Sequence, residues 1–414
     1  MTTKINNEHN KLNFSSEREQ SQACLNSAEH EKNQGRKVLN VPNLRFLEFQ
    51  GEWKELGLSE LLDFKNGLNP KPDKFGKGIK FISVMDILNN AVITYDCIKA
   101  SVDVTEKELS DFSVEKGDIL FQRSSETLED VGRANVYMDD KTAVFGGFVI
   151  RGKKKGEYDP QYFNYLLRSP FARKRIVPMG AGAQHFNIGQ EGLSKVKLHF
   201  ANIKEQKKIG KMFSLLDERI ATQNKIIDKL QSLIRGIRHD IFKDIQGEVL
   251  ALSNIADIYQ PQTISSSDLT SEGYWVYGAN GIIGKYKEYN HETEQICITC
   301  RGNTCGTVNY TQPKVWITGN TMVINTDKYQ RQVNKRFLFH YLSSYNFKSI
   351  VSGSGQPQIV RTPLEKIKVV LPTIEKQERI ANSIDIVSEK INTESSVLRL
   401  LENQKLYLLR QMFI

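Results

Sequence analysis

The chain has 414 residues, of which 39% are hydrophobic and 25% charged, so it is long enough for two or more globular domains. The net charge of +9 favours a polyanionic partner such as nucleic acid, although solubility alone would also account for it. Five cysteines are too few for a disulfide framework, and no apolar run reaches the ~18 residues of a membrane span, so we expect a cytoplasmic protein with no membrane partner.

Residues 1–42 are polar and show no sustained period, which predicts a disordered or weakly ordered tail. The first head follows at residues 43–201. Turn residues separate short apolar runs within it, and these runs predict strands at residues 79–84, 118–122, 134–137 and 148–150. A short helix between Tyr162 and Leu167 comes next, so we expect a mixed α/β domain with a twisted, mostly antiparallel sheet.

A long helix is predicted over residues 202–246. Asn202 followed by Glu205 has the form of a capping box, and Gly247 ends the helix. Between these limits, apolar residues recur in alternating steps of four and three, which is the spacing of a coiled-coil seam. The seam of this helix consists of Ile209, Phe213, Leu216, Ile220, Gln223, Ile227 and Leu230.

The same order of elements then repeats. The second head, residues 247–372, contains a helix between Phe337 and Leu342 and predicted strands at residues 275–277, 295–299, 307–310 and 322–324. A second long helix is predicted over residues 373–414, and its seam lies 171 residues after the first one, without a gap. This second seam consists of Ile380, Ile384, Val387, Ile391, Glu394, Leu398 and Leu401.

An apolar seam ~60 Å long is unstable in water and needs a partner, and the nearest partner is the other seam. The second head returns the chain to the far end of the first helix. We therefore expect an α+β protein in which two mixed α/β heads are joined by an intramolecular antiparallel coiled coil with pseudo-twofold symmetry. In such a coil Gln223 and Glu394 meet near the middle and fix the register; alternatively, both face solvent where the seam opens.

Catalytic motifs are absent from the sequence in the forms considered. Asp159–Tyr162 and Ser169–Phe171 lack the second proline of an adenine-methyltransferase motif. The glycines before Lys285 lack the spacing of a phosphate-binding loop. Cys297 and Cys300 lie three residues apart on a predicted strand and so point to opposite faces, which argues against zinc. We therefore expect no catalytic residue and no bound metal.

This arrangement resembles the specificity subunit of type I restriction–modification systems. The resemblance runs from about residue 42 to the carboxyl terminus, and its carriers are residues 43–46, residues 51–53 and the two strand-to-helix junctions. In the family each junction has leucine and proline, then a Glu-Gln pair and an Ile-Ala-like step. The first junction keeps Glu205, Gln206 and Ile209 but has Ala201 in place of proline. The second keeps Leu371, Pro372, Gln377, Ile380 and Ala381 but has Lys376 in place of glutamate.

The resemblance implies a chain that makes no bonds itself. It implies that each head is a target-recognition domain for one half of a split site in double-stranded DNA, while the paired helices set the spacing and dock two methyltransferase (M) subunits. Those subunits use S-adenosylmethionine to methylate adenine N6. With restriction or motor (R) subunits, which use ATP and Mg, the complex cleaves unmodified DNA. No cofactor is expected on this chain.

Two polar segments of the first head are candidate DNA contacts, one at the end of a predicted strand and one in a glycine-rich loop. Guanidinium forks fit guanine edges and phosphates, while amides can bond adenine bidentately. The candidates are Arg123, Ser124, Ser125, Gln184, His185 and Asn187. The alternatives are an arginine that ties down the adjacent loop and a glycine-rich loop that only packs on the helix.

The second head has candidates in the same two places, and we expect Arg123 and Arg301 to occupy the same strand end in the two heads. The candidates are Arg301, Asn303, Thr304, Gln356 and Gln358, with Tyr277, Asn280 and Lys285 as weaker ones. Base identity does not follow from any of these residues.

Two other functions stay open at this point. One is an enzyme whose catalytic residues lie in the divergent heads, and turnover of S-adenosylmethionine by the purified chain would favour it. The other is a coiled-coil adaptor that binds proteins without sequence-specific DNA binding. Binding to random duplex pools, with and without a methyltransferase partner, separates this adaptor from a DNA-reading subunit.

Overall fold

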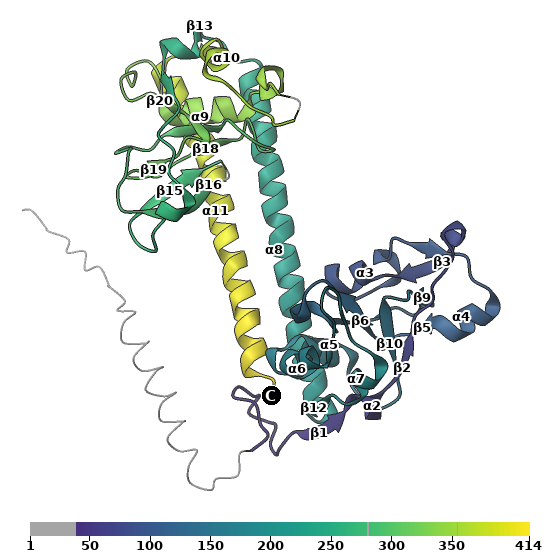
Figure 1. The fold of residues 1–414 in the computed structure, drawn as a ribbon. Helices are drawn as coiled ribbons and strands as arrows, with labels where there is room; N and C mark the ends of the chain where they lie inside the picture. The colour runs from purple at the N-terminus through teal and green to yellow at the C-terminus, as the bar shows by residue number, and fades with distance from the viewer. Residues whose placement is uncertain (1–38, 280, 354) are drawn as a thin grey trace, which may run out of the picture. The chain divides into compact units, whose positions relative to one another are not determined.

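The computed structural model describes residues 39–279, 281–353 and 355–414 (Figure 1). Residues 1–38 of the predicted tail lie outside the described residues. The chain divides into two compact units, Met1–Asp217 with Gln404–Ile414, and Glu218–Asn403. Each unit contains one head together with segments of both long helices, and each combines helices with sheets, as predicted.

The first head is made of short elements. Its strands are β1 (Lys54–Gly57), β2 (Leu62–Asn66), β3 (Phe75–Ile82), β4 (Ser101–Val102), β5 (Ser113–Val114), β6 (Ile119–Gln122), β7 (Ser124–Ser125), β8 (Ala134–Val136), β9 (Ala143–Phe145), β10 (Val149–Lys154), β11 (Phe186–Asn187) and β12 (Lys197–Phe200). Its helices are α2 (Leu58–Leu61), α3 (Val84–Asn89), α4 (Glu106–Phe112), α5 (Pro160–Arg168), α6 (Pro170–Ile176) and α7 (Gln190–Ser194), with 3₁₀ turns η2 (Pro72–Lys74), η3 (Tyr95–Cys97), η4 (Leu128–Asp130) and η5 (Val177–Met179).

One sheet of this head has the order β2-β10-β6-β8, and all its neighbours are antiparallel. Another has the order β4-β3-β9-β5, in which β3 and β9 run parallel. β1 pairs with β12, and β7 pairs with β11. Helix α5 buries Tyr162, Phe163 and Leu166 against the first sheet, and it begins where the Asp159 carboxylate accepts a hydrogen bond from the Tyr162 amide (2.8 Å).

The strand predicted over residues 79–84 ends early, at Ile82. The amide of Ser83 donates to the carboxylate of Asp86 (2.7 Å), and this local bond starts α3 at Val84. A capping interaction therefore overrides the apolar pattern that extended the predicted strand. The other predicted strands of the head correspond to β6, β8 and β10, although β10 continues to Lys154.

The second head has the same kind of composition. Its strands are β13 (Glu248–Ala251), β14 (Asp257–Tyr259), β15 (Tyr274–Gly278), β16 (Gly281–Tyr286), β17 (Ile296–Thr299), β18 (Val308–Tyr310), β19 (Trp316–Ile317), β20 (Thr321–Asn325) and β21 (Lys368–Leu371). Its helices are α9 (Lys335–Ser344) and α10 (Arg361–Glu365), with 3₁₀ turns η6 (Leu252–Asn254), η7 (Ser266–Asp268) and η8 (Phe347–Ile350).

The two heads share a strand order. The sheet β14-β20-β17-β18 of the second head repeats β2-β10-β6-β8 of the first. The pair β13–β21 repeats β1–β12, since Glu248 lies opposite Leu371 as Lys54 lies opposite Phe200. The sheet β16-β15-β19 repeats β4-β3-β9, since β15 pairs antiparallel with β16 and parallel with β19, as β3 does with β4 and β9. The internal repeat therefore includes the core of each head and not only the long helices.

Two long helices follow the heads. They are α8 (Ile203–Lys243), with 41 residues, and α11 (Ile374–Gln411), with 38. The predicted capping box at the start of α8 is only half formed. The Asn202 side chain accepts from the Glu205 amide (3.0 Å), but the Glu205 carboxylate accepts two bonds from the Arg45 guanidinium (2.7 and 2.8 Å). Glu205 is fully buried. Among the described ion pairs, Arg45 is the cation that balances its negative charge.

All the predicted seam residues are buried or half-buried. In the first unit, Phe213 stacks against Phe413 (ring centroids 5.8 Å apart), and Asp217 pairs with Lys405 (2.5 Å). In the second unit, the Gln223 amide donates to the main-chain oxygen of Glu394 (3.0 Å) and to its carboxylate. These two polar seam residues therefore bond to each other, and the alternative in which both face solvent is wrong.

A buried glutamine holds each long helix to its own head. Gln206 donates to the Ala201 oxygen (2.8 Å) and accepts from the Asp159 amide (2.9 Å). In the second unit, 171 residues later, Gln377 donates to the Pro372 oxygen (2.9 Å) and accepts from the Asn334 amide (2.9 Å). Each amide thus joins the strand end, the first helical turn and the start of α5 or α9, which explains why glutamine stands at this place in both junctions.

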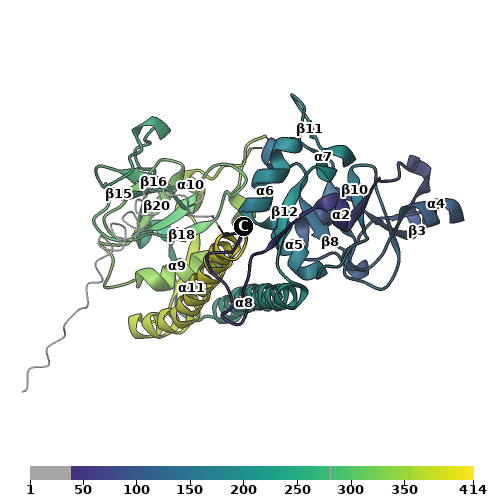
Figure 2. The same cartoon turned by 90° about the horizontal axis from the view of Figure 1, so that it is seen from below.

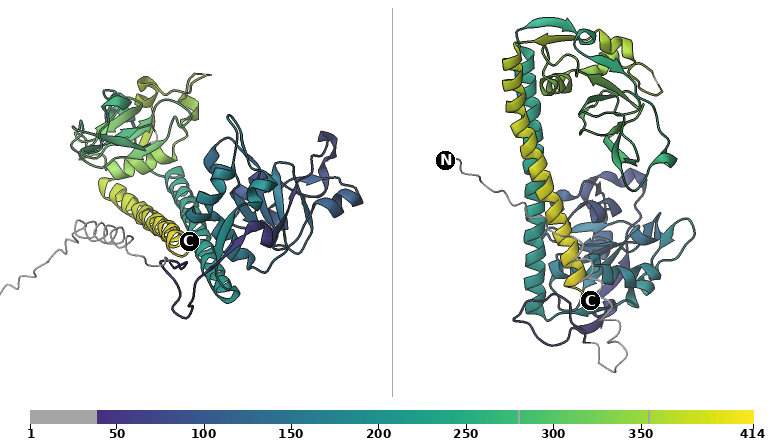
Figure 3. Two further views of the ribbon diagram at one scale, coloured as in Figure 1. Left: turned by 60° about the horizontal axis from the view of Figure 1, so that its bottom comes forward. Right: turned by 90° about the vertical axis from the view of Figure 1, so that its left-hand side faces the viewer.

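The N-terminal segment of the first head closes over the end of α11 (Figures 2 and 3). The Leu44 amide donates to the Gln411 oxygen (2.9 Å). The Trp53 ring lies edge-on to Tyr162 and Phe413, with centroids 6.1 and 6.4 Å apart. In the second unit, Phe242 near the end of α8 packs on Phe337 in the same way (5.6 Å). Each head therefore buries the end of one long helix as part of its core.

A buried charge network joins the second head to both long helices within its unit. Arg238 of α8 bonds His340 Nδ1 (2.9 Å), and His340 Nε2 bonds the Asp385 carboxylate of α11 (2.8 Å), which Arg336 also holds. A neutral imidazole with its proton on Nε2 satisfies both contacts. Burial lowers the pKa of His340 to about 4, against the opposing effect of Asp385.

We predict that Arg45→Met destabilises the first unit by about 3 kcal/mol, because Glu205 is left as a buried carboxylate without a cation. The measurement is urea unfolding followed by Trp53 fluorescence. Lys208→Met is the matched control, since its ion pair with Glu48 is exposed and such pairs contribute roughly 0–1 kcal/mol. Equal effects of the two substitutions would rule out the buried pair as a stabilising contact.

We also predict that the second unit loses stability as the pH falls from about 6.5 to about 4, because the unfolded chain binds a proton on His340 that the folded protein excludes. The contribution is on the order of 3 kcal/mol over this window. His340→Gln keeps a donor and an acceptor but does not titrate, so its unfolding midpoint should change less with pH. His239 is exposed, so His239→Gln should leave the pH dependence of the unfolding midpoint unchanged. If His239→Gln reduced this pH dependence as much as His340→Gln does, the assignment to His340 would be contradicted.

Candidate nucleic-acid interface

The structure brings the two candidate segments of the first head together. β7 and β11 form a short antiparallel ribbon in which Ser124 lies opposite Asn187 and Ser125 lies opposite Phe186. The Ser124 hydroxyl donates to the side-chain oxygen of Asn187. Asn187 is exposed and Ser124 is half-buried, so the ribbon presents polar side chains at the surface.

Gln184 and His185 lie in the tight loop that leads into β11, and both are exposed. The amide and carbonyl of Ala181 and Asn187 exchange two hydrogen bonds of 2.9 Å that close the loop. Gly182 adopts φ +144° with the His185 carbonyl directly against it, and a Cβ atom there would lie 2.0 Å from that oxygen. Glycine is therefore required for the turn that projects Gln184 and His185.

Arg123 has a different environment from the other candidates. Its amide donates to the Phe148 oxygen and its carbonyl accepts from the Ile188 amide, both at 2.9 Å. Its guanidinium contacts the Gly147 oxygen (3.4 Å). This is the loop-tying contact that the alternative interpretation of Arg123 predicted.

The second head repeats this ribbon with other side chains. Arg301 forms a bridge with Gln358, and Gln358 exchanges two main-chain bonds of 2.8 Å with Ser352. Gln356 lies in the loop between them, where Gly353 adopts φ +90°. Arg301, Gln356 and Gln358 are all exposed, as are Asn303 and Thr304 in the turn that follows Arg301.

The prediction that Arg123 and Arg301 occupy the same position is wrong by one residue. Gly132 donates to the Gln122 oxygen (2.9 Å) just as Gly306 donates to the Thr299 oxygen (2.8 Å). Arg123 therefore corresponds to Cys300, and both carbonyls accept from the isoleucine after β11 or its equivalent. Ser124 corresponds to Arg301. A shift of one residue in a strand reverses the side on which a side chain emerges, so only Arg301 projects from the ribbon.

The weaker candidates of the second head do not join this ribbon. Tyr277 is 8% exposed and packs among Cys297 and Ile317, where burial raises the pKa of its hydroxyl. The Lys285 ammonium lies over the Trp275 ring (4.8 Å) on the β15–β16 hairpin. Asn280 lies outside the described residues. The burial of Tyr277 makes it a core residue, and the prediction of a surface contact there is wrong.

The cysteines of the second head do not converge. Cys297 packs in one core cluster with Val323, and Cys300 packs in another with Phe337, on the other side of β17. This confirms the prediction that the two side chains face opposite sides. His291 bonds the Tyr259 hydroxyl (2.9 Å) and stacks on its ring. Within residues 39–279, 281–353 and 355–414, no cluster of three His, Cys, Asp or Glu residues is arranged to hold a metal.

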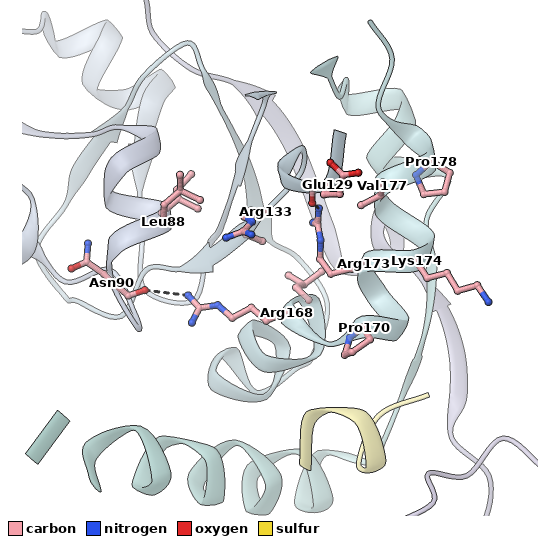
Figure 4. Close-up of a pocket in the computed structure, with 13 residues that line it drawn as sticks. Leu88, Asn90, Glu129, Arg133, Arg168, Pro170, Arg173, Lys174, Val177 and Pro178 are labelled. Carbon is pink, nitrogen blue, oxygen red and sulfur yellow. Dashed lines mark hydrogen bonds between the residues drawn. The ribbon is translucent and has the colours of Figure 1, made fainter. Parts of the chain in front are cut away.

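One feature of the first head was missed in the sequence. A pocket of about 830 Å³ opens in this head, and we call it the basic pocket (Figure 4). Its charged lining residues are Arg133, Arg168, Arg173, Lys174 and Glu129. They come from the start of β8, the end of α5, helix α6 and turn η4, and no sequence pattern joins segments so far apart. Isolated arginines at such places carry no signal of a shared site.

None of the described helices combines the length and the apolarity that a membrane crossing requires.

Residues 50–232 and 245–403 match the family model of the type I restriction modification DNA specificity domain. A relative from Methanocaldococcus jannaschii, the putative type I restriction enzyme MjaX specificity subunit, is 26% identical over 396 residues, covering 86% of this chain and 92% of its own. The type I restriction enzyme EcoprrI specificity subunit of Escherichia coli is 27% identical over 161 residues, covering 38% of this chain and 39% of its own.

Two solved structures share the fold. The type I restriction–modification S subunit from M. genitalium has a TM-score of 0.60 at 18% identity, covering 90% of this chain and 99% of that one. A chain from a study of complex assembly and conformational transition of the type I R-M system has a TM-score of 0.54 at 13% identity, covering 86% and 96%. At these identities the likeness concerns the fold alone.

Proposed function

Because the chain belongs to the family of type I restriction–modification specificity subunits, we propose that its two heads each read one half of a bipartite site in double-stranded DNA. The chain makes no bonds itself in this proposal. It directs adenine N6 methylation by methyltransferase subunits, or cleavage by the complex that also contains restriction subunits. S-adenosylmethionine, ATP and Mg act on those partners.

The observation that carries this proposal is that both heads present one backbone ribbon with different side chains. The first head offers Ser124 and Asn187, and the second offers Arg301 and Gln358 at the equivalent positions. Amide groups suit adenine, and a guanidinium suits guanine. The same backbone ribbon with different side chains would allow the two heads to recognise different half-site sequences. The overall excess of positive charge supports binding to the phosphate backbone.

We further propose that α8 and α11 form an antiparallel coiled coil that fixes the gap between the half-sites. Contacts within each unit support this direction. In the first unit Phe213 meets Phe413 and Asp217 meets Lys405, so the partner number falls as the α8 number rises. In the second unit the Gln223–Glu394 bond fixes the register of the seam.

Two equivalent surfaces support docking of two methyltransferase subunits. Leu215 on α8 and Ile386 on α11 are 171 residues apart and hold the same place in the repeat. They are 54% and 69% exposed, so each copy of the repeat presents an apolar side chain at the same position. Matched apolar positions, one in each unit, are consistent with the same partner binding twice.

We predict that Asn187→Ala weakens reading of one half-site and that Gln358→Ala weakens reading of the other. A bidentate amide–base contact contributes about 1–3 kcal/mol, so discrimination at one base pair should fall roughly 10- to 100-fold. The measurement is selection from random duplex pools by the complex with methyltransferase. Asn392→Ala on the exposed side of α11 is the control. Binding by the wild-type complex that ignores sequence would favour the protein-binding adaptor instead.

We also predict that one extra heptad in both α8 and α11, inserted at matched seam positions, lengthens the gap between the half-sites. Seven residues add ~10.5 Å, or up to about three base pairs, and preserve the seam. Methylome sequencing of a host that expresses the variant with its partner measures the gap. A seven-residue insertion near Ser267, in turn η7 of the second head, should leave the gap unchanged. An altered base preference with the original gap would contradict the proposal that the two long helices fix the gap.

A further inference from the structure

We propose that the basic pocket of the first head binds the DNA phosphate backbone beside the half-site, through a group of three guanidiniums that the second head lacks. This inference rests on the proposed function and deepens it. It assigns to Arg133, Arg168 and Arg173 the role of positioning the duplex, whereas the ribbon reads bases.

The three guanidiniums converge on the pocket from separate elements, whereas the Lys174 side chain points away along the rim (Figure 4). Arg168 at the end of α5 donates to the Asn90 oxygen (3.2 Å). Arg173 on α6 donates to the main-chain oxygens of Glu129 (2.9 Å) and Val131 (2.6 Å). These bonds to carbonyl groups orient two of the cations without neutralising them.

The charge of the pocket is only partly balanced. Arg133 pairs with Asp130 (2.6 Å), and Glu129 is the acidic residue among the lining residues, against four cationic side chains. Burial, followed by the nearby charge of Arg133, lowers the pKa of Arg173 to about 10. Within the part of the chain that the structure describes, Nη1 of Arg173 is buried without a hydrogen-bond acceptor. An anion in the pocket would relieve the repulsion and satisfy this donor.

Apart from Asn90, the remaining lining is apolar and includes Leu88, Leu167, Val177 and Pro178. A phosphate held by guanidiniums brings its deoxyribose with it, and the carbon-rich edges of the sugar fit an apolar wall. Free inorganic anions would gain nothing from such a wall. The mixture of cations and apolar carbon therefore favours a sugar–phosphate segment over a simple ion.

The segments that line the pocket adjoin the ribbon along the chain. Turn η4, which supplies Glu129, begins three residues after Ser125, and the Thr127 amide donates to the Ser125 hydroxyl (3.2 Å). On the other side, η5 supplies Pro178 and runs into Ala181, which pairs with Asn187. A duplex whose bases lie against the ribbon therefore passes its backbone over the pocket.

The second head shows that the shared fold does not need these arginines. Its equivalent of Arg133 is Thr307, since each follows the glycine that bonds the strand end and each amide donates to a residue three positions earlier. Its equivalent of Arg168 is Ser343, nine residues after the helix cap in both heads. Two of the three arginines are thus specific to the first head, and a structural role common to both heads does not explain them.

The test is the salt dependence of binding by the specificity–methyltransferase complex. Arg168 and Arg173 hold loop carbonyls, so the test uses Arg133→Gln, which leaves those bonds intact. Loss of one phosphate contact should reduce the slope of log K against log salt by about 0.9, equally for the cognate duplex and a random duplex. Arg133→Lys should restore the slope. The control is Lys107→Gln on α4, which removes the same charge from an exposed position of the same head.

A second readout locates the phosphate. Duplexes with single neutral methylphosphonates should bind the wild-type complex less well at one or two backbone positions beside the half-site of the first head. The Arg133→Gln complex should lose no further affinity at those positions. Equal slopes for Arg133→Gln and Lys107→Gln would overturn the inference. So would weaker binding of the methyltransferase subunit with an unchanged DNA slope, which would assign the pocket to an acidic protein segment.

Loss of the proposed function and loss of the pocket's role give different binding results. Wild-type complex that binds every duplex equally would remove the proposed function itself. Wild-type complex that selects its site, combined with no effect of Arg133→Gln, would remove only the role of the basic pocket.

Discussion

A buried glutamine amide at the first turn of each long helix holds that helix to its own head. Gln206 and Gln377 each bond the end of a strand and the start of a head helix while belonging to a long helix themselves. Because the amide is buried, neither partner can leave it without exposing an unsatisfied polar group to the core. Hydrogen bonds that are costly to break therefore hold each head to the start of its own long helix.

The long helices were predictable because their signal is local and repeated. A step of four and three residues needs no knowledge of distant contacts, and the two copies in one chain reinforce each other. The contact between the polar seam residues Gln223 and Glu394 was predicted from the same pattern, because both occupy the same position of the repeat near the middle of their helices. The partner of Glu205 did not follow. A capping box explained it locally, yet its carboxylate binds Arg45, 160 residues away.

The candidate interface was predictable in outline but not in register. Polar residues after a strand and in a glycine-rich loop marked two segments that the structure brings together, whereas the pairing of Ser124 with Asn187 depended on contacts between distant residues. The equivalence of Arg123 and Arg301 failed because two arginines near a strand end look alike in sequence while their side chains leave on different sides. Tyr277 failed because apolar partners from other strands bury it. The charged side chains of the basic pocket come from four separate parts of the chain, and no local sequence pattern predicts that they meet.

The hydrogen bond between Leu44 and Gln411 has a consequence for how such a chain could arise. The first head completes its core with the last turn of α11, and the second head completes its core with the last turn of α8. Each half of the polypeptide therefore supplies an aromatic side chain, Phe242 or Phe413, to the core of the other half. A product of one half alone would leave this side chain exposed. Two such products could bury it by packing against each other's heads. Fusion of two copies of a gene for such a homodimer would produce a chain with this internal repeat.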